Sequence, residues 1–362
     1  MVRWRRFTEI TSIAAGAVAA AFGVALAAEK VAVGRKRLRR DPAAAEPLGK
    51  LRGHSLTVLA DDGVPLHTEI DGPSKAPITV IFSHGFALNQ DCWHFQRRDL
   101  GAPGNGYRLV FSDQRSHGRS GRSDPERENI DQLARDLHAV IRAVAPRGAP
   151  VVLVGHSMGA MTIMALAGQH PGLFGRQVAA VVLISTSAGE LGQVTLGLPG
   201  PFGAVLRRAA PGVLRGAAKA NRAALVERAR HAGGDLAFLV TRFLAFGDPN
   251  TSPTITDFVE QMIRATPVGV VSRFFDALIE HDRYAALPTL GKVPTLVIVG
   301  GRDRLTPRSL AGKMAAQIPG AKMIVDEHAG HLIMLEHPEF VTAQLRELID
   351  SVAVSPRGIR SA

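Results

Sequence analysis

Residues 151–166 read VVLVGHSMGAMTIMAL and decide the fold of this chain. Ser157 stands between two apolar runs, and this order predicts a strand, a tight turn and a helix. Gly155 and Gly159 allow the strand and the helix to approach each other without clashes between Cβ atoms. We therefore expect a strained turn that holds the serine hydroxyl exposed between the two elements.

The pattern Gly-x-Ser-x-Gly is typical of a nucleophile elbow, the turn from which a serine attacks a carbonyl carbon. By itself the pattern is weak, because a chain with 37 glycines among 362 residues contains such pentapeptides by chance. A serine hydroxyl is also a poor nucleophile at neutral pH unless a base activates it and a carboxylate orients that base. The rest of the sequence has to provide both groups.

The composition is that of a globular protein, with 46% hydrophobic and 21% charged residues. The length allows two domains, but α/β folds often use this length for one core with an insertion. The net charge of +11 is concentrated in residues 1–52, which contain 11 Lys and Arg against 4 Asp and Glu. With 5% aromatic residues and no zinc-finger spacing, we expect no nucleic-acid partner. Cys92 is the only cysteine, which excludes an intrachain disulfide and a cysteine-based metal site.

The N-terminal segment, residues 1–40, predicts a membrane anchor. An uncharged stretch of 19 residues, 10–28, follows three arginines and precedes six Lys and Arg residues between Lys30 and Arg40. This length suits one membrane span, and the larger positive flank predicts that the following domain is cytoplasmic. The alternative is a cleaved signal peptide with an A-x-A site at 25–27, after which the protein is exported. Residues 41–54 are predicted to be a linker.

From residue 55 the chain alternates short β-rich runs with helical stretches, which predicts an α/β fold. We expect a mostly parallel eight-stranded sheet with helices on both faces, built from residues 55–189 and 288–352, and a flexible tail at 353–362. The first two strands should form a hairpin, and residues 129–145 should form an amphipathic helix. The strands are expected at 55–60, 65–70, 78–82, 108–111, 151–154, 179–184, 295–299 and 321–325.

Residues 190–287 contain no comparable strands and predict an inserted helical cap. Apolar residues recur at helical spacing around Leu225 and within 236–246, 258–263 and 270–279. An insertion of this size, just downstream of Ser157, is expected to form a lid over the serine. The alternative is helical padding without a functional role.

The base and the acid that Ser157 needs are expected at the ends of two later strands. Asp303 follows the strand at 295–299, and His331 follows the next strand along the chain. His328 competes with His331 for the role of base, and Glu190 competes with Asp303 for the role of acid. An oxyanion hole is also required, and the backbone N–H groups of Phe86 and Met158 are placed to form it.

Four short signatures follow one another along the chain, and together they resemble the α/β-hydrolase superfamily with a helical cap over residues 55–350. The resemblance implies the α/β-hydrolase fold and favours Ser157, Asp303 and His331 as the catalytic triad, in that chain order. One departure is Ser116, where family members usually carry glycine. The signatures are HGF at 84–86, DQRSHGRS at 113–120, GHSMG at 155–159, and GGRD at 300–303 followed by Gly330 and His331.

The resemblance also limits the chemistry. Epoxide hydrolases and haloalkane dehalogenases of the superfamily carry aspartate at the elbow, whereas this chain carries Ser157. The other polar residues of the signatures are expected to brace their own loops or to form local contacts. No histidine pair has metal-ligand spacing, so no metal and no cofactor are expected. Bracing of their own loops or turns is expected of His84, Asp113 and His117, and packing or a local hydrogen bond is expected of His156.

The sequence as a whole predicts a serine hydrolase, esterase-like or lipase-like, that cleaves a small lipophilic carboxylic ester through an acyl-enzyme. A cofactor-free perhydrolase resembling non-haem peroxidases and a carbon–carbon bond hydrolase are alternatives that use the same triad. A non-catalytic, membrane-tethered ligand-binding protein is the alternative from another class. Fold and triad do not choose the substrate, because the lid and the pocket do.

Overall fold

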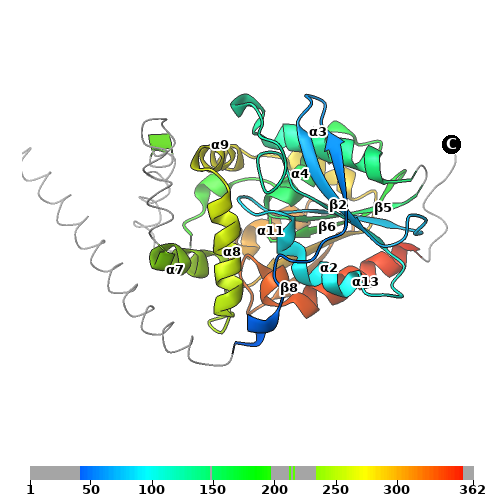
Figure 1. The fold of residues 1–362 in the computed structure, drawn as a ribbon. Coiled ribbons are helices and arrows are strands. Elements are labelled where there is room, and N and C mark those ends of the chain that lie inside the picture. Colours follow the sequence, from blue (N-terminus) through cyan, green and yellow to red (C-terminus); the bar gives the residue numbers. More distant parts are fainter. Residues whose placement is uncertain (1–40, 147–148, 197–211, 213–214, 217–233, 354–362) are drawn as a thin grey trace, which may run out of the picture.

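The computed structural model describes residues 41–146, 149–196, 212, 215–216 and 234–353 (Figure 1). The predicted membrane segment 1–40, the helical pattern around Leu225 and all but the first residue of the predicted tail lie outside this part of the chain. Among the described residues, no helix has both the length and the hydropathy that a membrane crossing requires.

An eight-stranded sheet forms the centre of the molecule, with the strands in the order β1-β2-β4-β3-β5-β6-β7-β8. β2 is antiparallel to both of its neighbours, and all other neighbouring strands are parallel. This arrangement confirms the predicted fold class and the opening hairpin. The strands are β1 His54–Leu59, β2 Pro65–Asp71, β3 Thr79–Ser83, β4 Arg108–Ser112, β5 Val151–His156, β6 Val178–Ile184, β7 Thr295–Gly300 and β8 Lys322–Asp326.

Helices cover both faces of the sheet (Figure 1). One face packs against α3, α4, α10 and α11, and the other packs against α2, α12 and α13. Successive side chains of β3 alternate between the two faces, with Ile81 on the first and Val80 and Phe82 on the second. The helices are α2 His94–Leu100, α3 Ile130–Val144, α4 Met158–Gln169, α10 Leu287–Leu290, α11 Arg308–Ala315, α12 Ile333–Glu336 and α13 Pro338–Ala353.

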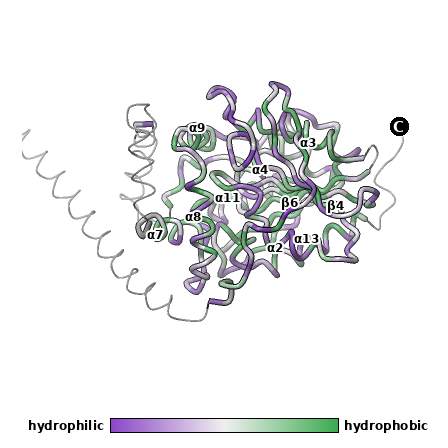
Figure 2. Tube along the Cα trace, viewed as in Figure 1, coloured by the Kyte–Doolittle hydropathy of each residue, from purple (hydrophilic) through white to green (hydrophobic). Residues whose placement is uncertain are grey.

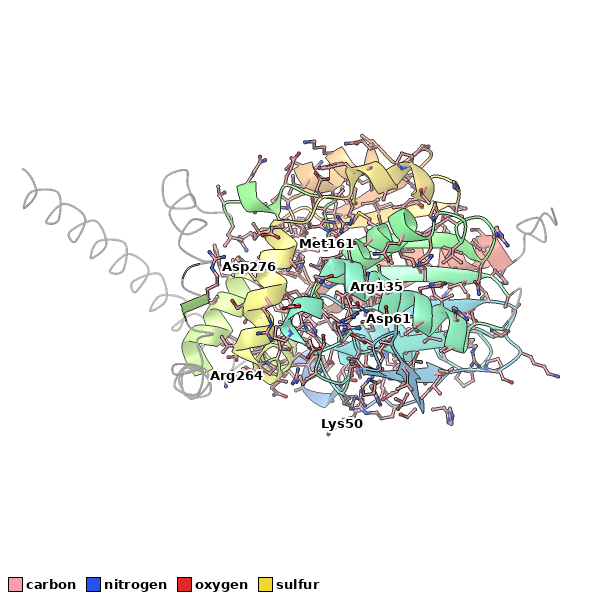
Figure 3. All side chains as sticks on the ribbon, turned by 90° about the horizontal axis from the view of Figure 1, so that it is seen from above. Lys50, Asp61, Arg135, Met161, Arg264 and Asp276 are labelled. Carbon is pink, nitrogen blue, oxygen red and sulfur yellow. The ribbon has the colours of Figure 1, made fainter. Side chains whose placement is uncertain are left out.

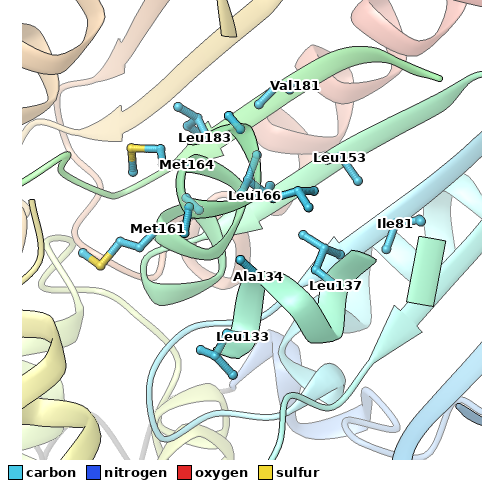
Figure 4. Close-up of a cluster of buried hydrophobic side chains, with 14 of the residues drawn as sticks. Ile81, Leu133, Ala134, Leu137, Leu153, Met161, Met164, Leu166, Val181 and Leu183 are labelled. Atoms are coloured by element: carbon cyan, nitrogen blue, oxygen red, sulfur yellow. The ribbon is translucent and has the colours of Figure 1, made fainter. Parts of the chain in front are cut away.

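The core on the first face is a continuous apolar cluster. Figure 4 shows Leu153 and Leu183 of the sheet in this cluster, together with Leu133 of α3 and Leu166 of α4. Figure 2 shows the middle of the sheet in green and much of the outer loops in purple, so hydropathy follows burial. This burial is the main term that stabilises the layers.

The helix α3 illustrates how the sequence sets the limits of an element. The Asn129 side chain caps its first turn by accepting the Gln132 N–H at 2.9 Å. The helix ends before Ala145, which is extended because a residue that precedes proline avoids the helical region. The predicted helix at 129–145 is therefore confirmed to within one residue at each end.

Three α-helices with described bounds lie between β6 and α10, at one end of the sheet (Figure 1). Phe258 and its neighbours on α8 join the core of one face, whereas Phe274 and its neighbours on α9 join the core of the other. Figure 3 shows Arg264 of α8 and Asp276 of α9 on this side of the molecule. The division into a core and a cap at residues 190–287 stays a prediction. The helices are α7 Gly234–Ala245, α8 Pro253–Ala265 and α9 Val268–Ile279.

The segment from residue 41 onward packs against α8. The Asp41 Oδ1 atom accepts the Ala43 N–H at 3.0 Å and caps a short 3₁₀ helix, Pro42–Ala45. The Asp41 Oδ2 atom accepts the hydroxyls of Ser252 (2.9 Å) and Thr254 (2.8 Å) at the start of α8. The start of the predicted linker therefore makes specific contacts with the helices that follow β6.

Candidate active site

Ser157 occupies the turn between β5 and α4, where its backbone adopts φ 52° and ψ −115°. A positive φ is strained for a residue that carries a Cβ. Two hydrogen bonds hold the turn: the Ser157 N–H donates to the Ile184 carbonyl at 2.9 Å, and the Thr186 hydroxyl donates to the Ser157 carbonyl at 3.0 Å. This is the geometry expected of a nucleophile elbow.

Both glycines of the pentapeptide stand where another backbone leaves no room for a side chain. A Cβ on Gly159 would lie 2.1 Å from the Ser83 carbonyl oxygen. A Cβ on Gly155 would lie 2.6 Å from the Cα atom of Ala160. Strand and helix therefore approach each other as closely as the sequence predicts.

The loop that follows β3 lies against the turn of Ser157. A Cβ on Gly85 would lie 3.3 Å from the Ser157 Cβ, so the chain enters Phe86 directly beside the serine. Met158 is the first residue of α4, where backbone N–H groups have no acceptor within the helix. Neither the Phe86 N–H nor the Met158 N–H has a hydrogen-bond acceptor among the described residues. An oxyanion hole requires two free N–H donors of this kind, so the assignment of Phe86 and Met158 stays a prediction.

Asp303 and His331 form a buried pair in which Asp303 Oδ2 lies 2.9 Å from His331 Nδ1. The carboxylate also accepts the N–H groups of Leu305 (2.9 Å) and Thr306 (2.8 Å) and the Thr306 hydroxyl (2.7 Å). These donors fix the orientation of the carboxylate. The contact at Nδ1 orients the His331 ring, and Nε2 is the ring nitrogen that a neutral histidine held in this way uses to accept a proton.

The loop that carries His331, residues 327–332, is called the base loop below. Its Gly330 N–H donates to the Glu336 Oε2 atom at 2.6 Å, and its Leu332 N–H donates to the Ala245 carbonyl at 3.0 Å. Ala245 is the last residue of α7. The base loop is therefore attached directly to the helices inserted between β6 and β7.

His156 joins the elbow to the base loop. Its Nε2 atom lies 3.0 Å from the His331 carbonyl oxygen, across 175 positions of sequence. The sequence predicted that His156 packs or forms a local hydrogen bond. The ring does pack, against the rings of Trp93 and His331, but its hydrogen bond is not local, because the fold brings a distant carbonyl to the ring. The contact places the loop of the base next to the residue that precedes Ser157.

The two rival residues lie elsewhere. Glu190 forms an ion pair with Lys313. The exposed His328 has its Nδ1 atom 3.2 Å from an Arg302 nitrogen. In the described part of the chain, neither rival contacts the pair that Asp303 forms with His331.

His84 and Asp113 hold the loops that surround the serine. The His84 Nδ1–H donates to the Gly85 carbonyl at 2.8 Å, and its Nε2 atom accepts the Gln114 N–H at 2.9 Å. Burial lowers the pKa of His84 to about 4, so the ring is neutral at pH 7 and this tautomer is fixed. Asp113 accepts the Arg119 N–H at 2.9 Å within its own turn.

Ser116, the departure from the superfamily pattern, adopts φ 62°, a conformation that favours glycine. Its hydroxyl oxygen accepts the Ser123 N–H at 3.1 Å, and its own N–H donates to the Gly121 carbonyl at 3.0 Å. The serine thus keeps the left-handed turn through a contact that glycine lacks. The neighbouring His117 uses its Nδ1 atom on the Arg115 carbonyl at 2.9 Å, which is a local contact.

Two residues that hold the site were missed by the sequence analysis. Thr306 donates to the Asp303 carboxylate, and its place in an Asp-x-x-Thr pattern before a proline was an available signal for a turn. Glu336 binds the base loop, but its spacing from His331 carries no general signal. Only the fold shows which N–H groups its carboxylate meets.

An open cavity of about 550 Å³ lies beside the loop of the acid. Its lining includes Asp303, Arg304 and Glu190 but neither Ser157 nor His331. This cavity therefore does not enclose the predicted reacting atoms.

Comparison with known proteins places these features in a family. The model of the alpha/beta hydrolase family matches residues 80–344, which is most of the chain. The AB hydrolase superfamily protein YisY of Bacillus subtilis is 27% identical over 296 residues, covering 81% of this chain and 98% of the relative. The bifunctional esterase/perhydrolase DCH of Acinetobacter calcoaceticus is 35% identical over 128 residues, covering 35% of this chain and 43% of the relative.

The solved structures agree with this placement. A thermophilic esterase from Thermogutta terrifontis superposes with a TM-score of 0.62 and 25% identity, covering 83% of this chain and 99% of the esterase. The shared fold, the family match and the elbow all lead to one identification. The chain belongs to the alpha/beta hydrolase family and is a hydrolase.

Proposed function

We propose that this protein is a serine hydrolase that cleaves a carboxylic ester through an acyl-enzyme. The observation that carries the proposal is the buried pair of Asp303 and His331, linked through His156 to the strained turn of Ser157. A histidine that a carboxylate orients, and a serine on an elbow, are two of the parts that nucleophilic acyl transfer requires.

In the proposed reaction, His331 Nε2 takes the proton of Ser157 as the serine oxygen attacks the carbonyl carbon. The N–H groups of Phe86 and Met158 bind the negative charge that develops on the carbonyl oxygen. His331 then gives its proton to the departing alkoxide, which leaves as an alcohol. In the second half, His331 deprotonates a water molecule, the water attacks the acyl-enzyme, and the carboxylic acid leaves as the proton returns to Ser157.

The experiment is labelling with a fluorophosphonate probe together with hydrolysis of p-nitrophenyl esters. We expect the wild-type protein to do both and Ser157→Ala to do neither. Ser351→Ala, on the exposed side of α13, is the matched control and should behave as wild type. Turnover that persists in a folded Ser157→Ala protein would contradict the mechanism.

A lipophilic acyl group is the finer part of the proposal. Its support is the apolar character of the helices between β6 and β7 and the uncharged stretch at 10–28, which also supports membrane association of a cytoplasmic hydrolase. Esters of increasing acyl length test it, and kcat/KM should rise from acetate to medium chains. A maximum at acetate would remove this part and leave the mechanism intact.

Perhydrolysis is the second candidate, and the similarity to the esterase/perhydrolase relative supports it. Here hydrogen peroxide replaces water as the attacking group, so the acyl-enzyme is released as a peracid. Peracid formation from acetate and peroxide, absent in Ser157→Ala, would favour this reaction. Assays with thioesters, lactones and a substrate of carbon–carbon bond hydrolases test the other reactions that use the same triad. A protein that binds such a substrate without becoming acylated would favour the non-catalytic binding protein.

A further inference from the structure

His156 is the residue at which three parts of the site meet. It is the last residue of β5 and directly precedes Ser157, and it is 1% exposed. Its ring packs 4.8 Å from the His331 ring, measured between centroids, and 6.4 Å from the Trp93 ring. The ring is therefore buried and packs directly against the ring of His331.

The hydrogen bond to the base loop has a defined direction. The His331 carbonyl oxygen only accepts, so the His156 Nε2 atom must carry the proton of this 3.0 Å contact. Burial, and next the charge that His331 can acquire, lower the pKa of His156 well below its usual value. A neutral ring is also what the mechanism needs, because a second positive charge beside His331 would oppose its protonation.

The opposite ring nitrogen faces the loop that follows β3, residues 84–86, which is called the oxyanion loop below. A Cβ on Gly85 would lie 2.6 Å from the His156 Nδ1 atom, and this nitrogen has no hydrogen-bond partner among the described residues. The loop that leads into Phe86 thus rests on one edge of the ring, while the His331 carbonyl rests on the other. The His156 side chain therefore lies between the oxyanion loop and the base loop.

We propose that His156 is a positioning residue whose Nε2–H holds the base loop at a fixed position relative to Ser157 and the oxyanion loop. This inference rests on the proposed function, because it assigns His156 a role through His331 rather than through contact with substrate. Without the donor, the His331 carbonyl is left buried and unpaired, and the loop relaxes away from the elbow.

Three variants separate the hydrogen bond from packing. His156→Gln retains a donor at the reach of Nε2, His156→Asn has a donor only at the shorter reach of Nδ1, and His156→Leu has no donor. We expect the variants His156→Leu and His156→Asn to lower kcat by about 10-fold to 100-fold and to change KM by less than about 3-fold. Misplacement of a catalytic group by about 1 Å has effects of this size. We expect Gln to remain within about 3-fold of wild type, since it restores the bond.

The rates are expressed per active site, titrated with the fluorophosphonate probe, and each variant is compared with wild type in thermal unfolding. His138→Leu on α3 is the matched control and should retain wild-type kcat, because the His138 ring packs against His170, the residue that follows α4. If His156→Leu fails to fold, the contrast between Gln and Asn decides the question.

Equal kcat values for Gln and Asn per titrated site would overturn the inference, as would a Leu variant with wild-type kcat. A wild-type protein that the probe does not label would instead contradict the proposed function. The two failures are therefore distinguishable in the same experiment.

Discussion

The Asp303 carboxylate accepts hydrogen bonds from two backbone N–H groups, from His331 and from the Thr306 hydroxyl. The same hydroxyl lies 3.2 Å from His331 Nδ1, so it touches both members of the pair. Thr306→Val keeps the shape and removes the donor. We expect kcat to fall about 10-fold, because a hydrogen bond to a charged group contributes about 1.5 to 3 kcal/mol.

Steady-state hydrolysis of a p-nitrophenyl ester measures this effect. Thr306→Ser, which retains the hydroxyl, is the conservative control and should keep most of the activity. A valine variant with unchanged kcat would mean that the backbone N–H groups alone orient the acid.

His281 is buried after α9, and neither of its ring nitrogens has a hydrogen-bond partner among the described residues. Burial, and next the charge of Arg283, lower the pKa of His281 from 6.5 to about 4, against the opposite effects of Asp282 and Asp131. Between these pH values the unfolded chain binds a proton that the folded chain does not. The part of the unfolding free energy that is linked to His281 is therefore fully present above pH 6.5 and is lost as the pH falls toward 4.

His281→Leu removes this titration without removing a hydrogen bond. We expect the loss of unfolding free energy between pH 7 and pH 5 to be smaller than in wild type by about 2 kcal/mol. Urea unfolding at the two pH values measures it. An unchanged difference between pH 7 and pH 5 would show that His281 titrates normally in the folded chain.

At the scale of elements, Glu336 joins the base loop to the segment that follows α7. Its Oε1 atom accepts the Gly247 N–H at 2.8 Å and also the Asp248 N–H, while Oε2 accepts the Gly330 N–H at 2.6 Å. The two backbones are in direct contact, because a Cβ on Gly330 would lie 2.4 Å from the Gly247 nitrogen. The loop of the base and the helices after β6 therefore share one junction.

We expect Glu336→Ala to lower the unfolding free energy by about 2 kcal/mol and kcat by about 10-fold, since it leaves these N–H groups without their charged acceptor. Urea unfolding and ester hydrolysis measure the two effects. Glu128→Gln is the control, because Glu128 pairs with Arg273 of α9 and touches neither the base loop nor the acid. If both variants lose kcat equally, docking of the helices rather than the junction determines the rate.

At the scale of the whole molecule, the chain before β1 stabilises the helices inserted after β6. Asp41 accepts the hydroxyls of Ser252 and Thr254 and the Thr254 N–H (3.1 Å), more than two hundred positions away. We expect Asp41→Ala in the full chain to lower the unfolding free energy by about 1 to 2 kcal/mol, with kcat nearly unchanged. Urea unfolding measures this loss.

Asp124→Ala is the matched control for Asp41, because the Asp124 side chain makes no capping hydrogen bond at its own 3₁₀ turn. Its effect should stay within about 0.5 kcal/mol. Equal losses in the two variants would mean that the contact between Asp41 and α8 contributes no net stability.

The elements of the core could be read from the sequence because their signals are local. The valine-rich run before Gly155 and the apolar periodicity after Asn129 each fix a strand or a helix within a few residues. The elbow is equally local, since two glycines and one serine define its geometry. For the same reason Ser157, Asp303 and His331 could be proposed together, because parallel strands deliver their carboxyl ends to one edge of the sheet.

The contacts that hold the site were not readable in this way. Ser116 stands where the superfamily usually has glycine, and its hydroxyl accepts a hydrogen bond from the Ser123 N–H. The Glu336 carboxylate accepts hydrogen bonds from N–H groups of two segments that are distant in the sequence. A carboxylate or an imidazole has no sequence signal for its partner, because the partner depends on which backbones the fold brings within about 3 Å.

The sequence by itself determined the sheet, the elbow and the candidate triad, because strand periodicity and turn chemistry act over a few residues. Only the tertiary structure decided that the ring of His156 separates the oxyanion loop from the base loop, with its Nε2–H on the His331 carbonyl. The physical reason is that a hydrogen bond between segments depends on distance in space, and packing of the whole core sets that distance.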